Sequence, residues 1–315
     1  MILCTDTFLD EHRHRLESVA PHADAVVLSA TGDVSDADRE RITIAFFSTD
    51  TWPERAASFM SAALDAPRLR WFHTMSAGVD HPVFRRFLDR GVLLTTSSGS
   101  SAGPIADTAM MYLLALSCDL PRSMRAKERH EWTWARWSEL AGRRIAVVGW
   151  GPIGREIARL AVAHGMAPTV VRRRARGDEG FPTRRLDELV DVVTEHHAVA
   201  VALPLTAETY RIVSAPVIAA MRPGTLFVNV GRGELVDQAA LTAALQDGHL
   251  GGAGLDVTDP EPLPPDDPLW ELPNVIITPH NSGSTDGTAR RAVEAFLDNL
   301  RRWRDGGNLL NRVDP

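Results

Sequence analysis

The sequence of 315 residues is poor in cysteine, in long apolar runs and in excess positive charge, and each shortage narrows the class of protein. Its two cysteines, Cys4 and Cys118, form no C-x-x-C pair, which excludes a thiolate zinc site and favours a reducing compartment. No apolar run approaches the ~20 residues of a membrane-spanning helix. The net charge of −7 argues against nucleic acid or an anionic membrane as a partner. Because the first residues also lack the pattern of a secretory signal, we expect a cytoplasmic globular protein.

Short apolar runs alternate with helix-like segments, which favours parallel sheets joined by helices. Four runs in the first hundred residues predict buried strands, at 25–30, 42–47, 69–74 and 91–96. A small polar loop then precedes a long apolar helix that ends before Pro121. Six further runs between residues 143 and 280 indicate a doubly wound sheet of the Rossmann type. With 44% hydrophobic residues, the chain is long enough for two α/β domains.

A glycine-rich turn, VVGWGPIG, follows the first strand of the second series. It has the G-x-G-x-x-G spacing that holds a dinucleotide when it joins a strand to a helix. The first glycine allows the tight turn, the second lets the backbone approach a pyrophosphate, and the third packs the helix on the strand. The alternative is a glycine turn without a ligand. The cofactor contacts expected here are Gly149, Gly151, Pro152, Ile153 and Gly154.

Arginines stand where such folds usually carry an acid. The acid that binds the ribose 2′-OH comes about 20 residues after the turn, and this chain has Arg172, Arg173, Arg174 and Arg176 there. An acid would repel a 2′-phosphate, whereas an arginine binds phosphate with two donors. We therefore expect Arg172, Arg173 and Arg174 to select NADP(H) over NAD(H). The alternative is a solvated basic loop.

Three polar residues follow successive predicted strands, where open α/β sheets bind their ligands. Arg232 stands between two glycines, and its planar guanidinium suits a carboxylate. Glu261 lies in a proline-rich loop, and His280 follows Pro279. Taken singly, each has an ordinary explanation as a surface charge, one acid among several, or a core histidine. Together, beside a dinucleotide turn, they indicate the acid–base and substrate-orienting groups of a dehydrogenase that needs no metal.

These stretches resemble the D-isomer-specific 2-hydroxyacid dehydrogenases over nearly the whole chain. The resemblance rests on TMSAGVDH, ELAGRRIAVVGWGPIGREIA, LPLTAETYRIV, MRPGTLFVNVGRGELVDQAALTAAL, GGAGLDVTDPEPLPPDDPLWELPNVIITPH and the terminal helix. TMSAGVDH and the arginines are most similar to NADPH-dependent glyoxylate and hydroxypyruvate reductases. The family implies D-specific hydride transfer between NADP(H) and a small 2-oxo or 2-hydroxy acid.

The resemblance also implies residue roles. His280 would be the general acid in reduction, Glu261 its hydrogen-bond partner, and Arg232 the group that binds the carboxylate and polarises the ketone. The backbone amides at Ala77, Gly78 and Val79 would bind the other side of the carboxylate. Further cofactor contacts would come from Pro204, Thr209, Val230, Gly231, Arg232, Asp256, His280 and Gly283.

The family fold implies two doubly wound parallel-sheet domains with a cleft between them. Residues 1–98 and 284–315 would form a flavodoxin-like substrate domain, and residues 99–283 the Rossmann cofactor domain. Relatives often extend a partner-contacting arm near the tryptophans at 132, 134 and 137, so we expect a homodimer. The alternative is that these tryptophans pack on the Rossmann domain.

Two other functions stay open. Phosphite and formate dehydrogenases share this framework, although formate has no carbonyl to protonate. A dehydrogenase-like corepressor that senses NADP(H) could keep the arginine, glutamate and histidine without turnover. The loop SSGSS at 97–101 departs from many relatives, so the side of the pocket that recognises the substrate's R group is open.

Overall fold

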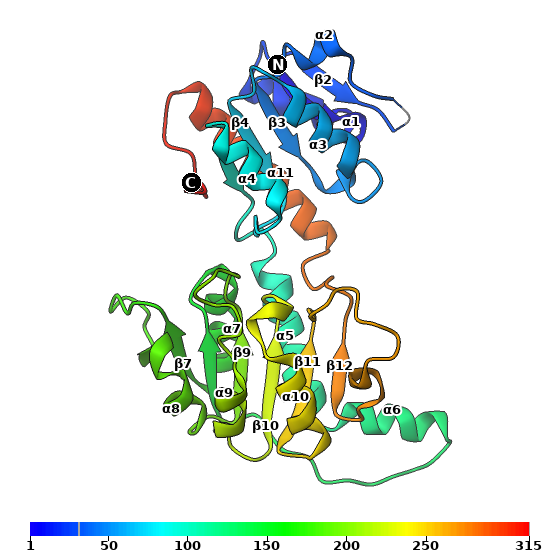
Figure 1. Cartoon of the computed structure of the whole chain (residues 1–315), viewed down its shortest axis with the longest axis vertical. Helices are drawn as coiled ribbons and strands as arrows, with labels where there is room; N and C mark the ends of the chain where they lie inside the picture. Colours follow the sequence, from blue (N-terminus) through cyan, green and yellow to red (C-terminus); the bar gives the residue numbers. More distant parts are fainter. Residues whose placement is uncertain (31, 315) are drawn as a thin grey trace. The chain divides into compact units, whose positions relative to one another are not determined.

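The computed structural model describes residues 1–30 and 32–314 of the chain (Figure 1). It divides into two compact units, one formed by Met1–Ser101 with Ser284–Pro315 and the other by Ala102–Gly283. The sequence placed the first boundary after residue 98, and the units part after Ser101. Within the described residues, no helix is both long and apolar enough to cross a membrane.

The first unit is built on a five-stranded parallel sheet in the order β2-β1-β3-β4-β5, the flavodoxin-like order. One strand, β1, was not predicted, because its four apolar-to-small residues ILCT at the chain start carry too little pattern. The strands are β1 (Ile2–Thr5), β2 (Ala25–Leu28), β3 (Ile44–Phe47), β4 (Trp71–Thr74) and β5 (Leu93–Thr96). The helices are α1 (Asp6–Val19), α2 (Asp36–Arg39), α3 (Ala56–Asp65), α4 (Pro82–Asp89) and α11 (Asp286–Arg304).

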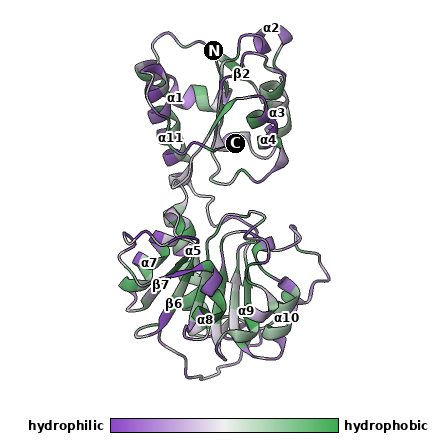
Figure 2. Ribbon diagram, turned by 60° about the vertical axis from the view of Figure 1, so that its left-hand side comes forward, coloured by the Kyte–Doolittle hydropathy of each residue, from purple (hydrophilic) through white to green (hydrophobic). Residues whose placement is uncertain are grey.

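Neighbouring residues of each strand fill opposite faces of this sheet. Phe46 stacks on Phe296 of α11 with ring centroids 4.2 Å apart, and the next residue, Phe47, packs edge-on against Phe59 of α3 at 5.4 Å. Helices α1 and α11 therefore cover one face and α3 and α4 the other (Figure 2). Helix α11 lies near the C-terminus, and its apolar face packs on the sheet formed by the first hundred residues. This packing joins the C-terminal segment to the first unit.

The second unit is a seven-stranded parallel sheet in the order β12-β11-β10-β9-β6-β7-β8. Six strands were predicted, and β8 was missed because its three residues, TRR, show no apolar alternation. The strands are β6 (Arg144–Val148), β7 (Ala167–Arg172), β8 (Thr183–Arg185), β9 (Ala198–Val201), β10 (Thr225–Asn229), β11 (Leu250–Leu255) and β12 (Val275–Ile277). The helices are α5 (Ala102–Ser117), α6 (Leu120–Glu128), α7 (Pro152–Ala163), α8 (Leu189–Val193), α9 (Ala215–Ala220) and α10 (Gln238–Gln246).

Strand β6 shows how this sheet is covered on both faces. Ile145 and Val147 pack with α5 and α7, while Ala146 and Val148 pack with α8, α9 and α10 on the other face. The chain order reverses between β6 and β9, so the carboxyl ends of the strands meet beside the point where doubly wound sheets bind dinucleotides.

The tryptophans after α6 do not pack on the second unit, so that alternative is wrong. Trp132 is 100% exposed, Trp134 78% and Trp137 59%. They lie in the extended segment that leads from α6 back to β6.

Candidate active site

The glycine turn between β6 and α7 has the geometry that a pyrophosphate requires. Gly149 has a φ of +117°, and a Cβ there would lie 2.4 Å from the carbonyl oxygen of Ala202. A Cβ on Gly154 would lie 2.0 Å from the Gly149 oxygen, so helix and turn are in direct backbone contact. At Gly151, the N-cap of α7, a Cβ would meet no atom within 4 Å. The middle glycine therefore borders open space beside the free N–H groups of the helix start, and a cofactor phosphate fits there.

The arginines after β7 are not equivalent. Arg172 ends the strand, and its Nη1 lies 2.8 Å from Oε1 of Glu179, whose side chain is only 2% exposed. Arg173, Arg174 and Arg176 are exposed, and Nη1 of Arg173 lies 3.1 Å from Oε2 of Glu208. The structure thus gives the guanidinium of Arg172 an internal partner, Glu179, whereas the side chains of its three neighbours are exposed.

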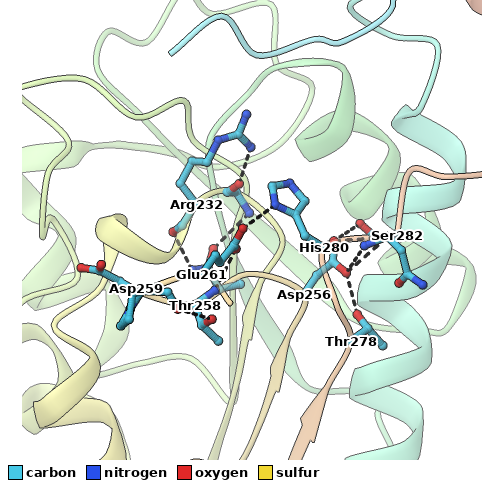
Figure 3. A network of polar contacts seen from close by, with 12 residues as sticks. Arg232, Asp256, Thr258, Asp259, Glu261, Thr278, His280 and Ser282 are labelled. Atoms are coloured by element: carbon cyan, nitrogen blue, oxygen red, sulfur yellow. Dashed lines mark hydrogen bonds and ion pairs between the residues drawn. The ribbon is translucent and has the colours of Figure 1, made fainter. Parts of the chain in front are cut away.

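His280 and Glu261 come together from the ends of β12 and β11 (Figure 3). Nδ1 of His280 lies 2.8 Å from Oε2 of Glu261, so the hydrogen bond expected from the sequence is present. Oε1 of Glu261 accepts a hydrogen bond from the Thr258 amide at 3.1 Å. The loop is tied to α10, because the Asp259 amide donates to Oε1 of Gln238 at 2.9 Å. Both oxygens of Glu261 are thereby oriented, and Nε2 of His280 faces away from the carboxylate.

His280 and Glu261 shift each other's pKa values. The hydrogen bond to Glu261 raises the pKa of His280, against the opposing effect of burial. Burial pushes the pKa of Glu261 upward, but His280, the Thr258 amide and Arg232 outweigh it and lower that pKa overall. Each group favours the charged form of the other, as a general acid near neutral pH requires.

Asp256 fixes the loop that carries His280, a function that the sequence did not reveal. Its side chain is buried, and Oδ1 accepts hydrogen bonds from Thr278 Oγ1 at 2.6 Å and from the Asn281 and Ser282 amides at 3.1 and 3.2 Å. The Ser282 hydroxyl bonds to Oδ2. His280 has a φ of +50°, a left-handed conformation that costs about 1–2 kcal/mol for a residue with a Cβ. The bonds to Asp256 hold the strained residue in place.

Arg232 follows β10 in a turn shaped by Asn229. Nδ2 of Asn229 donates to the Arg232 carbonyl at 2.8 Å, and Oδ1 accepts from the Gly231 amide at 3.0 Å. Nη1 of Arg232 donates to the Gly231 carbonyl at 2.7 Å. A Cβ on Gly233 would lie 1.9 Å from the Thr258 carbonyl oxygen, so only glycine lets this turn contact the loop of Glu261. Figure 3 shows the guanidinium above Glu261 and beside His280.

The other residues expected to contact the cofactor lie on the neighbouring loops. Thr209 is buried, and its hydroxyl donates to the Pro204 carbonyl at 2.7 Å, so that it shapes the loop after β9 from within. Val230 and Gly231 are buried directly after β10. Gly283 is the last residue of the second unit.

The residues expected to bind the substrate carboxylate belong to the first unit. Ala77, Gly78 and Val79 form a loop after β4. Oγ of Ser76 donates to the Gly78 carbonyl at 2.9 Å, and the Ser76 carbonyl accepts from the Ser97 amide at 3.1 Å. The loop is therefore tied to the end of β5.

Comparison with known proteins identifies the framework. Residues 110–282 match the model of the D-isomer specific 2-hydroxyacid dehydrogenase NAD binding domain. The chain belongs to this family. A glyoxylate reductase of Korarchaeum cryptofilum is 33% identical over 264 residues, which cover 78% of this chain and 77% of the relative.

Solved structures agree with this assignment. A D-isomer specific 2-hydroxyacid dehydrogenase from Xanthobacter autotrophicus, in complex with NADPH and MES, is 30% identical with a TM-score of 0.81. The match covers 100% of this chain and 98% of that one. An NADPH-dependent glyoxylate/hydroxypyruvate reductase from Sinorhizobium meliloti, in complex with NADP and malonate, is 28% identical with a TM-score of 0.76 over 99% and 96% of the two chains. The predicted fold class of two parallel-sheet α/β domains is confirmed. The protein is a D-2-hydroxyacid oxidoreductase with an NAD(P)-binding domain.

Proposed function

We propose that the protein reduces small, unphosphorylated 2-oxo acids of the glyoxylate or hydroxypyruvate type with NADPH. The pairing of His280 with Glu261 carries this proposal, because it supplies an oriented, charged acid at the strand ends of a dinucleotide-binding sheet. The names of the relatives from Korarchaeum cryptofilum and Sinorhizobium meliloti support the substrate class.

The chemistry divides between the cofactor and the chain. NADPH, when bound at the glycine turn, would supply the hydride for this reduction. Nε2 of His280 donates its proton to the carbonyl oxygen, so that the 2-oxo acid becomes a 2-hydroxy acid and the imidazole becomes neutral. Glu261 holds Nδ1 and keeps the ring in the right orientation. Arg232 binds the substrate carboxylate and stabilises the negative charge that develops on the oxygen.

Each unit has a role of its own in this proposal. Residues 1–101 and 284–315 would form the substrate-binding domain, and residues 102–283 the cofactor domain. The amides at Ala77, Gly78 and Val79 would bind the substrate carboxylate. Pro204, Thr209, Val230, Gly231, Asp256 and Gly283 would frame the nicotinamide and its ribose from the loops on which they lie.

The cofactor preference rests on charge. The turn from Gly149 to Gly154 would bind the pyrophosphate, and the exposed Arg173 and Arg174 would bind the 2′-phosphate that distinguishes NADPH. A preference of about 1.4 kcal/mol is already a tenfold difference in affinity.

Initial rates at 340 nm on the purified protein test this function. Glyoxylate, hydroxypyruvate, pyruvate and a bulky aryl-2-oxo acid are each offered with NADPH and then with NADH. We expect rapid NADPH oxidation with glyoxylate and hydroxypyruvate. Turnover of the aryl acid alone would contradict the pocket size, and tight NADPH binding without turnover of any acid would favour a cofactor-sensing protein.

A homodimer in the cytoplasm is the expected state. Trp132, Trp134 and Trp137 are exposed, and the adjacent helices expose further apolar side chains at Met111 and Met124. Each buried tryptophan adds about 150–250 Å² to a contact, and a stable interface needs about 800 Å² from each partner. Light scattering should give twice the monomer mass, and Trp132→Ala with Trp134→Ala should shift it to the monomer. A monomeric mass for the wild-type protein would refute the proposed homodimer.

A further inference from the structure

A buried carboxylate organises the loop after β7. Oε1 of Glu179 lies 2.8 Å from Nη1 of Arg172 and accepts a hydrogen bond from the Arg176 amide at 2.8 Å. Oε2 accepts from the Gly177 amide, also at 2.8 Å. The hydrogen bond from the Arg176 amide, with those from Arg172 and Gly177, lowers the pKa of Glu179 in spite of its burial. The loop is therefore folded around an ionised side chain and joined to the last residue of the strand.

This arrangement divides the arginines into two sets. The charge of Arg172 is neutralised inside the loop by Glu179, whereas Arg173, Arg174 and Arg176 stay exposed. Backbone amides that bond to a fixed carboxylate lose conformational freedom, so the exposed arginines start from a preformed loop. Binding of a ligand to these arginines therefore costs less conformational entropy of the loop than binding to a disordered loop would.

A second carboxylate reaches one of these arginines, Arg173, from the loop after β9. Glu208 lies in the turn after β9, and its Oε2 is 3.1 Å from Nη1 of Arg173. The two side chains are 70% and 73% exposed, and ion pairs at such exposure are weak. A phosphate, with about two negative charges and three acceptor oxygens, can displace this carboxylate from Arg173.

We infer that Glu179 and Glu208 set the strength of the NADP(H) preference in opposite directions. Glu179 is a positioning residue that holds the loop in the form that receives the 2′-phosphate. Glu208 competes with that phosphate for Arg173 and moderates the preference. The inference rests on the proposed use of NADP(H), and it adds two acidic residues to a selectivity otherwise assigned to arginines alone.

Direct binding measurements test both residues without turnover. Isothermal titration with NADPH and separately with NADH is done on wild type, Glu179→Gln, Glu179→Asp and Glu208→Gln. Glu195→Gln is the matched control, because Glu195 makes a similarly exposed pair with Arg144 at the amino end of β6. Thermal unfolding of each variant reports on folding independently of the cofactor.

We expect Glu208→Gln to tighten NADPH binding by about two- to fivefold and to leave NADH binding unchanged. Glu179→Gln should weaken NADPH about tenfold and NADH less than twofold, with Glu179→Asp between it and wild type. Glu195→Gln should change neither. If Glu179→Gln does not fold, Glu179→Asp gives the same comparison in a variant that keeps the charge.

Other outcomes separate the two proposals. Equal weakening of NADPH and NADH in the Glu179 variants would make that residue structural only, and an unchanged NADPH affinity in Glu208→Gln would remove the competition. Either result, with a wild type that prefers NADPH, overturns the inference and leaves the proposed function intact. A wild type that binds NADH as tightly as NADPH overturns both.

Discussion

Glu261→Gln probes the acid–base pair directly, because it removes one charge and changes almost no volume. Oε2 of Glu261 lies 2.8 Å from Nδ1 of His280, and this contact raises the pKa of His280. Reduction needs the protonated imidazole, so activity is present below that pKa and is lost as the pH rises through it. Removal of the carboxylate lowers the pKa, and the alkaline limb of kcat/KM must therefore move to lower pH.

The size of the shift follows from charge and exposure. Two unit charges 4 Å apart interact by about 1 kcal/mol in water and about 4 kcal/mol at an effective dielectric of 20. The side chains of His280 and Glu261 are 46% and 38% exposed, so solvent screening keeps the interaction near the lower value. We therefore expect the alkaline limb of Glu261→Gln to lie at lower pH than that of wild type, with a displacement that the screening keeps modest.

The assay is kcat/KM for glyoxylate reduction with NADPH between about pH 6 and pH 9, with the NADPH dissociation constant measured alongside. Glu271→Gln is the control, since Glu271 is exposed later in the same segment, whereas Glu261 is the acid bonded to His280. The rate of Glu261→Gln at pH 8 should fall by about tenfold, a part of the roughly 10²–10⁴-fold that a positioned general acid contributes. A limb that stays at the wild-type pH would refute the electrostatic reasoning, even if the rate falls.

Four further substitutions, one of them compared with wild type in a pH titration, test other residues of the structure. Asp256→Asn should lower the free energy of unfolding by about 1–3 kcal/mol and should also lower kcat, because it releases the loop of His280. An unchanged free energy of unfolding in denaturant would contradict this prediction. Gly151→Ala should keep the melting temperature and weaken NADPH binding, whereas Gly154→Ala should lower the melting temperature, since only the second Cβ meets backbone. Burial lowers the pKa of His73 to about 3, so its stabilising effect is complete above about pH 6.5 and is lost as the pH falls toward 3. Between about pH 6.5 and pH 3, the free energy of unfolding of wild type should fall by about 1.4 kcal/mol per pH unit more than that of His73→Gln. If denaturant unfolding gives the same pH dependence for both proteins, His73 does not contribute in this way.

The fold was largely predictable because buried parallel strands are continuous apolar runs and their helices repeat at a different period. Strands β1 and β8 were not predicted, because ILCT and TRR are too short to show a period. Their pairing depends on β2 and β7, which lie elsewhere in the chain. Such tertiary stabilisation overrides weak local preference.

Site residues could be predicted where a motif or the strand order gives their position. Residues whose role depends on a side-chain contact in the folded protein could not be predicted. The spacing of the strands brought His280 and Glu261 to one sheet edge, and the structure joins them. Nothing in the sequence distinguishes Arg172 from its neighbours, because its partner Glu179 is known only once the loop is folded. The buried state of Asp256 likewise depends on Thr278 and Ser282, which follow a different strand.

Comparison of His280→Ala with wild type tests most directly whether His280 is the proton donor. NADPH oxidation is followed at 340 nm with glyoxylate and hydroxypyruvate, and NADPH binding is followed by fluorescence. We expect reduction to fall by about 10²–10⁴-fold in His280→Ala while NADPH still binds. Retained turnover in His280→Ala would contradict the assignment of the proton donor, and no turnover in wild type would contradict the proposed reductase.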